Sequence, residues 1–393
     1  MTKTHYIVPI EPCPRRDTRP VPVFREPCVS TCRNRLKKIS LLAAVCFVYT
    51  GTLFAQQNIV APRQYIAQKT SERITIDGKG AEASWQKTAW SEDFIDIEGD
   101  KTPAYKTKVK MLWDDEYLYF YAEMEEPHVW ATLKQRDTVI FYNNDFEIFI
   151  DPDGDTHNYM EFEMNALNTI WDLYLVKPYR ESAPVIDSWD IQGIKTAVHI
   201  DGTLNNPNDT DKGWSVEVAM PWNVLVEAHG RVSPTTPENE FWRINFSRVN
   251  WDFELVDGKY QRKKGKDGKY LPEYNWVWSP QWVINMHEPE WWGYVYFSPE
   301  KPGGKEDHSI PQDEKIKWKL YELYRKQKQH FQEHGKWMNS LRELVGKSVV
   351  IDGKPVKIAL ELHSMGWNLT ATSPFTGRLL TVKEDGKFIS KNN

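Results

Sequence analysis

The chain has 393 residues, of which 40% are hydrophobic and 27% are charged, so it can bury the core of one large domain and of a smaller one. Its formal net charge of -5 and isoelectric point near 6.1 argue against the basic surface of a nucleic-acid-binding protein, and we expect no nucleic-acid partner. Tryptophan is unusually frequent, with 18 residues, which predicts an aromatic core or an exposed aromatic surface.

Residues 1–55 are predicted to be a leader followed by a secretory signal peptide. Four basic residues between positions 33 and 38 precede an apolar run at 39–54, and the run closes at the small residue Ala55. This order is typical of a secretory signal, and cleavage near Ala55 would make the protein secreted or periplasmic. An uncleaved signal anchor is the alternative, and it is the only membrane attachment that we expect. All four cysteines precede Ala55, so the processed chain would contain no disulfide.

Short runs with strand-like alternation, separated by turn signals, follow from Arg73 to Ser298, and helical periodicity is almost absent there. This pattern predicts an all-β domain, either a sandwich or a barrel. A short helical turn is expected near residues 222–227, and the Lys- and Gly-rich segment 256–269 is expected to be an exposed hairpin tip.

One run, at residues 141–155, leads directly into an acidic turn. Phe146, Ile148 and Ile150 alternate with Glu147 and Phe149, which predicts a strand that buries one face and carries a carboxylate on the other.

The turn after this strand has an aspartate at every second position, namely Asp151, Asp153 and Asp155. Like carboxylates repel each other unless a cation or hydrogen-bond donors neutralise them. Calcium takes about six to eight oxygen ligands in irregular loops, so it suits this turn better than zinc or copper. The sequence predicts a calcium site here, and an exposed acidic turn without metal is the alternative. A second candidate acidic turn contains Asn206, Asn208, Asp209 and Asp211.

The character of the chain changes after Ser298. Residues 299–312 are polar and rich in Pro and Gly, which predicts a linker. Residues 313–393 predict a small α+β region, with two short helices interrupted at His334-Gly335 and a β-hairpin unit after them.

Several phrases in the strand-rich part resemble the family 9 carbohydrate-binding module and its relatives. They occur in the family's order, and they are Ile76-Asp77-Gly78 with Glu82 and Trp85, Trp113-Asp114-Asp115 with Leu118-Tyr119, the strand Asn144–Asp151, the run Gly213–Trp222, Trp278-Ser279 and Trp292-Gly293. The resemblance implies that residues 56–298 form an antiparallel β-sandwich of jelly-roll or immunoglobulin-like type. It also implies calcium sites and a sugar site in which two aromatic side chains clamp a terminal sugar ring.

The resemblance implies particular residues for one half of that sugar site. Phe141 and Tyr142 stand where the family has one clamping tryptophan, and Glu147 corresponds to a glutamate that hydrogen-bonds sugar hydroxyls. Glu163 stands where the family has an arginine, so a donor has become an acceptor. The aromatic character and one carboxylate are thus retained in this half.

The other half of the site departs from the family. Counting through the segment 275–292 places Met286 at the second clamping tryptophan, with His287 beside it, while Trp282 could substitute if the loop is wound differently. Trp276, Trp278 and Trp292 are expected in the core, whereas Trp282 and Trp291, near Pro and polar neighbours, are expected either in the core or at the surface.

The leading hypothesis is therefore non-catalytic binding of an oligo- or polysaccharide in support of glycan degradation, beside glycan-degrading enzymes that are encoded separately. One alternative is a glycoside hydrolase, which needs two carboxylates about 5 to 9.5 Å apart across a cleft. Carboxylates that could form such a pair are Glu147, Glu161, Glu163, Asp172 and Asp190. The second alternative is a structural or haem-binding relative of the same sandwich, with Met286 and His287 as available ligands.

Overall fold

The computed structural model describes residues 60–229 and 236–392. The predicted leader, signal peptide and signal anchor lie outside these described residues, so localisation stays a prediction. Within the described ranges, no helix combines the length and the apolar character needed to cross a membrane.

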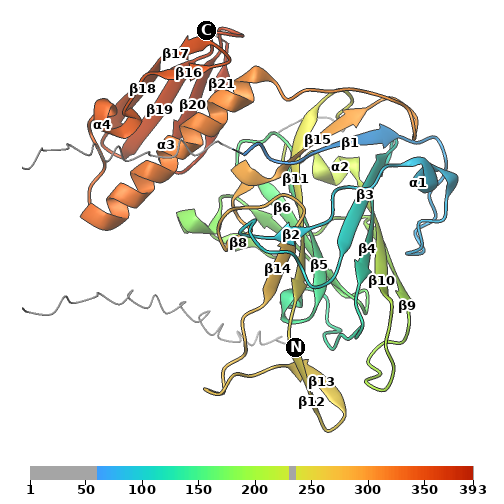
Figure 1. The fold of residues 1–393 in the computed structure, drawn as a ribbon. Helices are drawn as coiled ribbons and strands as arrows, with labels where there is room; N and C mark the ends of the chain where they lie inside the picture. Colours follow the sequence, from blue (N-terminus) through green and yellow to red (C-terminus); the bar gives the residue numbers. More distant parts are fainter. Residues whose placement is uncertain (1–59, 230–235, 393) are drawn as a thin grey trace, which may run out of the picture. The chain divides into compact units, whose positions relative to one another are not determined.

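Most strands belong to one large 13-stranded sheet that curls into two layers (Figure 1). The strand order is β8-β7-β6-β5-β11-β15-β1-β3-β4-β10-β9, and β14 pairs with β11 and β2 beside this path. The strands of the sheet are β1 (Gln64–Lys69), β2 (Ile95–Asp96), β3 (Thr107–Trp113), β4 (Tyr117–Glu125), β5 (Asp145–Asp151), β6 (Tyr159–Asn165), β7 (Ile170–Leu175), β8 (Val185–Ile186), β9 (Lys195–Asp201), β10 (Gly213–Pro221), β11 (Phe241–Asn250), β14 (Tyr274–Val277) and β15 (Gly293–Ser298).

Strand β1 joins the two layers into one sheet. It pairs in parallel with both β15 and β3, whereas the other pairs of the sheet are antiparallel. The predicted all-β sandwich is thus confirmed, and its sheet is mixed at this one strand. Short helices lie in the connections between strands, namely α1 (Ala83–Lys87), η1 (Ile140–Tyr142), η2 (Tyr179–Glu181), α2 (Trp222–Leu225) and η3 (Pro289–Trp291), and β12 (Phe253–Val256) pairs with β13 (Lys259–Arg262) in a separate hairpin.

An aromatic core fills the space between the layers. Phe246 of β11 lies 5.7 Å from Phe120 of β4 and 5.9 Å from Phe146 of β5, between ring centroids. Phe146, Ile148 and Ile150 all belong to this core, as the alternation of the sequence predicts. Truncating a buried ring such as Phe246 to alanine would cost about 3–5 kcal/mol of unfolding free energy.

The C-terminal region has its own core. Its elements are α3 (Gln312–His334), α4 (Leu341–Val345), the hairpin of β16 (Val349–Ile351) and β17 (Lys354–Val356), and a four-stranded sheet of β18 (Ile358–His363), β19 (Gly366–Thr372), β20 (Leu379–Lys383) and β21 (Phe388–Lys391). One face of α3, including Leu320 and Tyr324, packs against Trp367 and Leu380 of this sheet. The helix ends at Gly335 in the left-handed conformation, where the sequence predicts a break, but it is a 23-residue helix rather than a short one.

The C-terminal region contacts the acidic turn that follows β5. Lys317 of α3 is 3% exposed and donates a hydrogen bond to the Gly154 carbonyl oxygen. Lys387 forms a 3.0 Å ion pair with Asp155, and the Phe388 amide donates to the Asp155 carbonyl oxygen at 3.0 Å. Two lysines from a distant part of the sequence thus bring positive charge to this turn.

We expect Lys317→Met to lower the unfolding free energy by about 3 kcal/mol, because the change removes the buried one of the two lysines that compensate the carboxylates of this turn. Chemical denaturation of the full chain would measure this loss. Lys315→Met is the matched control on the same helix, since Lys315 pairs with Asp352 at a partly exposed site and should cost less than about 1 kcal/mol. Equal losses in the two variants would contradict this role of Lys317.

Candidate functional site

The face of β5 and β6 that points away from the aromatic core carries carboxylates. Asp145 and Glu147 lie two residues apart on this face of β5, and Glu163 of β6 lies directly opposite Glu147. One oxygen from each of these three side chains lies within 4.8 Å of the others, and the side chains are 0–4% exposed. We call Asp145, Glu147 and Glu163 the carboxylate cluster.

Burial dominates the electrostatics of the carboxylate cluster. It raises the pKa of Glu147 to about 7, and burial together with the charge of Glu147 raises the pKa of Asp145. Burial, Asp145 and Glu147 raise the pKa of Glu163, against a 3.0 Å hydrogen bond that its Oε2 accepts from the Phe141 amide. Both carboxylate oxygens of Asp145 lack a hydrogen-bond partner. The predicted site residues Phe141, Glu147 and Glu163 are thus brought together, but the carboxylates are buried.

Tyr142 lies at the surface beside this face rather than within the cluster. Its side chain is 43% exposed, its ring centroid is 4.9 Å from that of Phe141, and the Arg262 guanidinium lies 4.5 Å above the ring. The same guanidinium also lies over Trp251 and Tyr270. Tyr142 therefore belongs to an aromatic group around Arg262.

Met286 and His287 are engaged by the protein itself. Met286 is 8% exposed and packs in an apolar cluster with Phe149 and Trp292. His287 Nδ1 lies 2.8 Å from the Tyr159 hydroxyl, and burial followed by the charge of Arg180 lowers the pKa of His287 to about 3. Neither contact favours the haem alternative.

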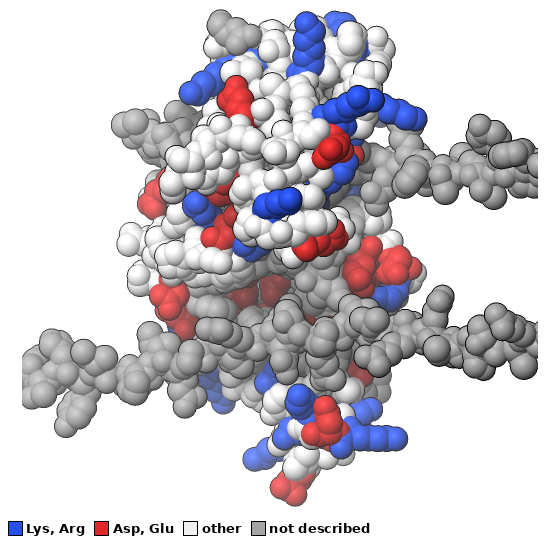
Figure 2. Space-filling view, turned by 90° about the vertical axis from the view of Figure 1, so that its left-hand side faces the viewer, with Lys and Arg blue, Asp and Glu red and all other residues white. Residues whose placement is uncertain are grey.

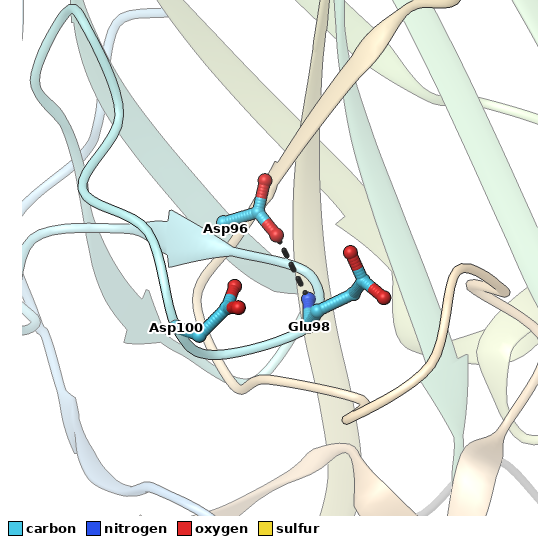
Figure 3. A group of neighbouring side chains, drawn as sticks. All are labelled: Asp96, Glu98 and Asp100. Carbon is cyan, nitrogen blue, oxygen red and sulfur yellow. Dashed lines mark hydrogen bonds between the residues drawn. The ribbon is translucent and has the colours of Figure 1, made fainter.

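Trp282 is 44% exposed, and its ring packs on a neighbouring turn at Gly99. A Cβ atom added to Gly99 would lie 2.6 Å from its ring, so only glycine fits there. This turn carries Asp96, Glu98 and Asp100, and Asp96 accepts a 3.1 Å hydrogen bond from the Glu98 amide (Figure 3). Trp282 therefore positions the turn at residues 96–100.

The donor set at Asp151, Asp153 and Asp155 is already partly used. Asp151 is fully buried and accepts hydrogen bonds from the Gly154 and Thr156 amides, at 3.0 Å and 2.9 Å. Burial, then Asp153 and Asp155, raise the pKa of Asp151. One oxygen from each aspartate still lies within 4.8 Å of the others, so the three could hold calcium, but Lys317 and Lys387 supply positive charge there. Calcium at this turn stays a prediction.

The second acidic turn satisfies its own backbone. Asp211 accepts from the Thr203 and Val129 amides at 2.6 Å and 2.8 Å, and Asp209 accepts from the Thr203 hydroxyl at 2.6 Å. These hydrogen bonds give the turn a structural role.

The carboxylates proposed for hydrolysis fall into separate settings. Asp172 and Asp190 both bind Arg136, at 2.6 Å and 2.8 Å, and Glu161 lies on β6 beside the carboxylate cluster. Oxygens within the cluster approach more closely than the separation of about 5 to 9.5 Å that a glycosidase uses. The hydrolase alternative stays a prediction.

A cavity of about 390 Å³ lies at the ends of β11 and β14. Its lining includes five aromatic side chains, which are Tyr105, Trp251, Phe253, Tyr274 and Trp276. Tyr274 is 42% exposed, whereas Trp276 is buried below it with its ring centroid 5.9 Å away. The cavity thus has an aromatic wall that solvent reaches at Tyr274.

Polar groups line the same cavity and are fixed by a buried arginine. Arg248 donates to Glu126 Oε2 at 2.9 Å and to Asn250 Oδ1 at 3.1 Å. Asn144 holds the Trp251 amide at 2.9 Å, and burial raises the pKa of Glu126 despite the charge of Arg248. Glu126, Asn144 and Asn250 therefore present preorganised amide and carboxylate groups beside the aromatic wall.

Charges of both signs surround the mouth of this cavity. Asp96 and Asp252 contribute carboxylates, and Lys101 and Lys263 contribute ammonium groups. Figure 2 shows mixed charges over the face in view and a gathering of basic side chains at its bottom, where β12 and β13 lie in Figure 1. No single sign dominates the mouth.

The sequence patterns do not predict this cavity. Tyr274 and Trp276 stand two residues apart and share a face of β14, and Asn250 ends the neighbouring strand β11 just before Trp251. Strand alternation and the position of the strand end are the local patterns that mark these residues. The spatial meeting with Asp96 and Asn144 leaves no mark in the sequence.

We expect Glu163→Gln to weaken the pH dependence of stability when divalent cations are chelated. A buried carboxyl whose pKa is raised on folding stabilises the fold at pH values below the pKa of the unfolded state. This stability is lost as the pH rises through the pKa of the folded state, and for Glu147 folding raises the pKa from 4.5 to about 7. Removing one carboxylate should reduce the loss between about pH 5 and pH 8, as thermal unfolding would show. Glu361→Gln, at an exposed position, is the control, and an unchanged pH profile in Glu163→Gln would contradict the expectation.

Comparisons with known proteins bear on the family. Residues 76–238 match the family model described as carbohydrate family 9 binding domain-like. Two solved structures of a carbohydrate binding module family 9 from Caldicellulosiruptor kristjanssonii, in complex with cellotriose and with glucose, are 14% and 15% identical to this chain. Each is covered over 100% of its length, and covers 63% of this chain, with TM-scores of 0.38 and 0.39. No curated protein matches the chain.

The family match begins within the first resembling phrase, Ile76-Asp77-Gly78, and includes β3 to β10 with the carboxylate cluster. The chain contains, at residues 76–238, a domain of the carbohydrate family 9 binding domain-like family, which confirms the resemblance in its sequence.

Proposed function

We propose that this chain binds an oligo- or polysaccharide in the cavity at the ends of β11 and β14. The observation that carries the proposal is the aromatic wall of Tyr274 and Trp276 beside preorganised amide and carboxylate groups. Binding sites for small ligands combine such apolar surfaces with a few well-placed polar groups. The carbohydrate family 9 domain at residues 76–238 supports this ligand class.

The chemistry of the cavity suits a sugar. A sugar ring has a flat apolar face, which packs on an aromatic ring, and hydroxyl groups, which bond to amide and carboxylate oxygens. Tyr274 offers the exposed ring, and Asn144 and Asn250 offer amide groups. The volume of about 390 Å³ falls at the lower end of the range of about 300–1,000 Å³ for small-ligand pockets, so a short stretch of the glycan would occupy it.

The proposal includes a role outside the cytoplasm. The predicted signal peptide supports a secreted or periplasmic protein that holds a glycan for degradation by separately encoded enzymes. Binding without cleavage is part of the proposal, because Glu126, a carboxylate of the cavity, is paired with Arg248. Incubation with a bound glycan should release no reducing sugar.

Tyr274→Ala is expected to weaken glycan binding at least about tenfold, a loss of about 1.4 kcal/mol, because it removes the exposed ring of the cavity. A glycan array on the full chain would identify a ligand, and calorimetry would compare the variants. Tyr270→Ala is the matched control, since Tyr270 is 49% exposed but lies outside the lining.

Tyr142→Ala tests the site that the sequence predicts. If Tyr142→Ala weakens glycan binding while Tyr274→Ala leaves it unchanged, the glycan binds at the surface beside Phe141 and not in the cavity. An array without any bound glycan would refute the function itself.

A further inference from the structure

We propose that Asp145, Glu147 and Glu163, the carboxylate cluster, bind a divalent cation of the oxygen-preferring class, such as Ca²⁺ or Mn²⁺. This site is separate from the acidic turn at residues 151–155 and from the cavity, and it does not rest on sugar binding.

The strand register brings the three ligand groups together. Glu147 and Glu163 are a directly paired couple across β5 and β6, and Asp145 precedes Glu147 by two residues on the same face. Each offers an oxygen within 4.8 Å of the others. Both oxygens of Asp145 are free of hydrogen bonds although its side chain is 0% exposed, so they are available to a ligand that replaces water.

Two further buried polar side chains flank the carboxylate cluster. Ser247 of β11 lies directly opposite Glu147 on the other side of β5, is 0% exposed, and its side chain lowers the pKa of Glu147, against the larger effect of burial. Glu161, the next carboxylate on the same face of β6, is 5% exposed, and its Oε2 accepts no hydrogen bond. Buried polar atoms left unpaired are costly, and a cation that takes these oxygens as ligands would remove that cost.

The carboxylate cluster differs from the other acidic groups in its lack of a basic neighbour. In the described part of the chain, Lys101 pairs with Glu98 at 3.2 Å, Arg136 with Asp172 at 2.6 Å, and Lys387 with Asp155 at 3.0 Å. These ion pairs supply positive charge to the three other acidic groups of the described chain. The groups are Asp96, Glu98 and Asp100; Asp137, Asp172 and Asp190; and Asp151, Asp153 and Asp155.

Within the same described residues, no ion pair reaches the carboxylate cluster. The nearest contact of this kind is between His287 Nε2 and Glu161 Oε2, at 3.9 Å, and the lowered pKa of His287 keeps that imidazole neutral. Three carboxylates held in register without positive charge require protons or a bound cation.

The ligand atoms decide the class of cation. They are carboxylate oxygens and a hydroxyl, without nitrogen or sulfur within the proposed set. Hard cations such as Ca²⁺ and Mn²⁺ prefer this donor set, whereas zinc and copper favour imidazole and thiolate ligands.

Calorimetric titration of CaCl2 and MnCl2 into the chelator-treated full chain tests the proposal, with thermal unfolding as a second readout. The unaltered chain should bind cation and show a higher thermal midpoint in its presence. Asp145→Asn should weaken the affinity at least about tenfold and remove most of the midpoint rise. Glu163→Gln, a second variant of the cluster, should do the same.

Asp137→Asn and Asp100→Asn are the matched controls, because each changes one aspartate of another acidic group. Both should keep the affinity of the unaltered chain. Without cation, Asp145→Asn should be at least as stable as the unaltered chain, since the change removes an uncompensated carboxylate, so misfolding would not mimic lost binding. The proposal is overturned if the unaltered chain binds no cation, if Asp145→Asn binds it fully, or if Asp137→Asn or Asp100→Asn alone abolishes binding.

Discussion

The antiparallel register of β5 and β6 is the constraint on which much of this molecule depends. It sends Phe146 and Phe162 into the aromatic core and leaves Glu147 and Glu163 side by side on the opposite face. The core favours this pairing strongly, because shifting one strand by a single residue would exchange apolar and acidic faces. The carboxylates are therefore held together by the packing of the core, and their mutual repulsion has to be offset locally.

The protein offsets acidic charge at another place by means of its C-terminal region. Lys317 reaches the turn after β5 from α3, and Lys387 reaches it from the segment before β21. A second polar contact joins the same regions, since Arg180 and Arg325 share Glu288 and Glu290. The acidic turn is thus a packing surface, and a calcium ion there would have to coexist with two lysines.

The fold retains the family's sandwich and places the sugar-binding residues that the resemblance implies in different surroundings. Tyr142 lies under Arg262 at the surface, Glu147 and Glu163 are buried, and Met286 belongs to an apolar cluster. The cavity at the ends of β11 and β14 has the aromatic and amide groups that this face lacks. The cavity and the carboxylate cluster meet near the start of β5, since Asn144 lines the cavity and Asp145 belongs to the cluster.

Strand alternation is a local property, so the sequence predicts the all-β character, the buried face of Phe146, Ile148 and Ile150, and the common face of Glu161 and Glu163. The compensation of the acidic charges depends on the folded chain, since Lys317 and Gly154 are 163 residues apart. The same holds for the cavity, whose walls come from segments near residues 96, 144, 250 and 274. Contacts between distant segments depend on the packing of the whole sheet, and no local pattern encodes them.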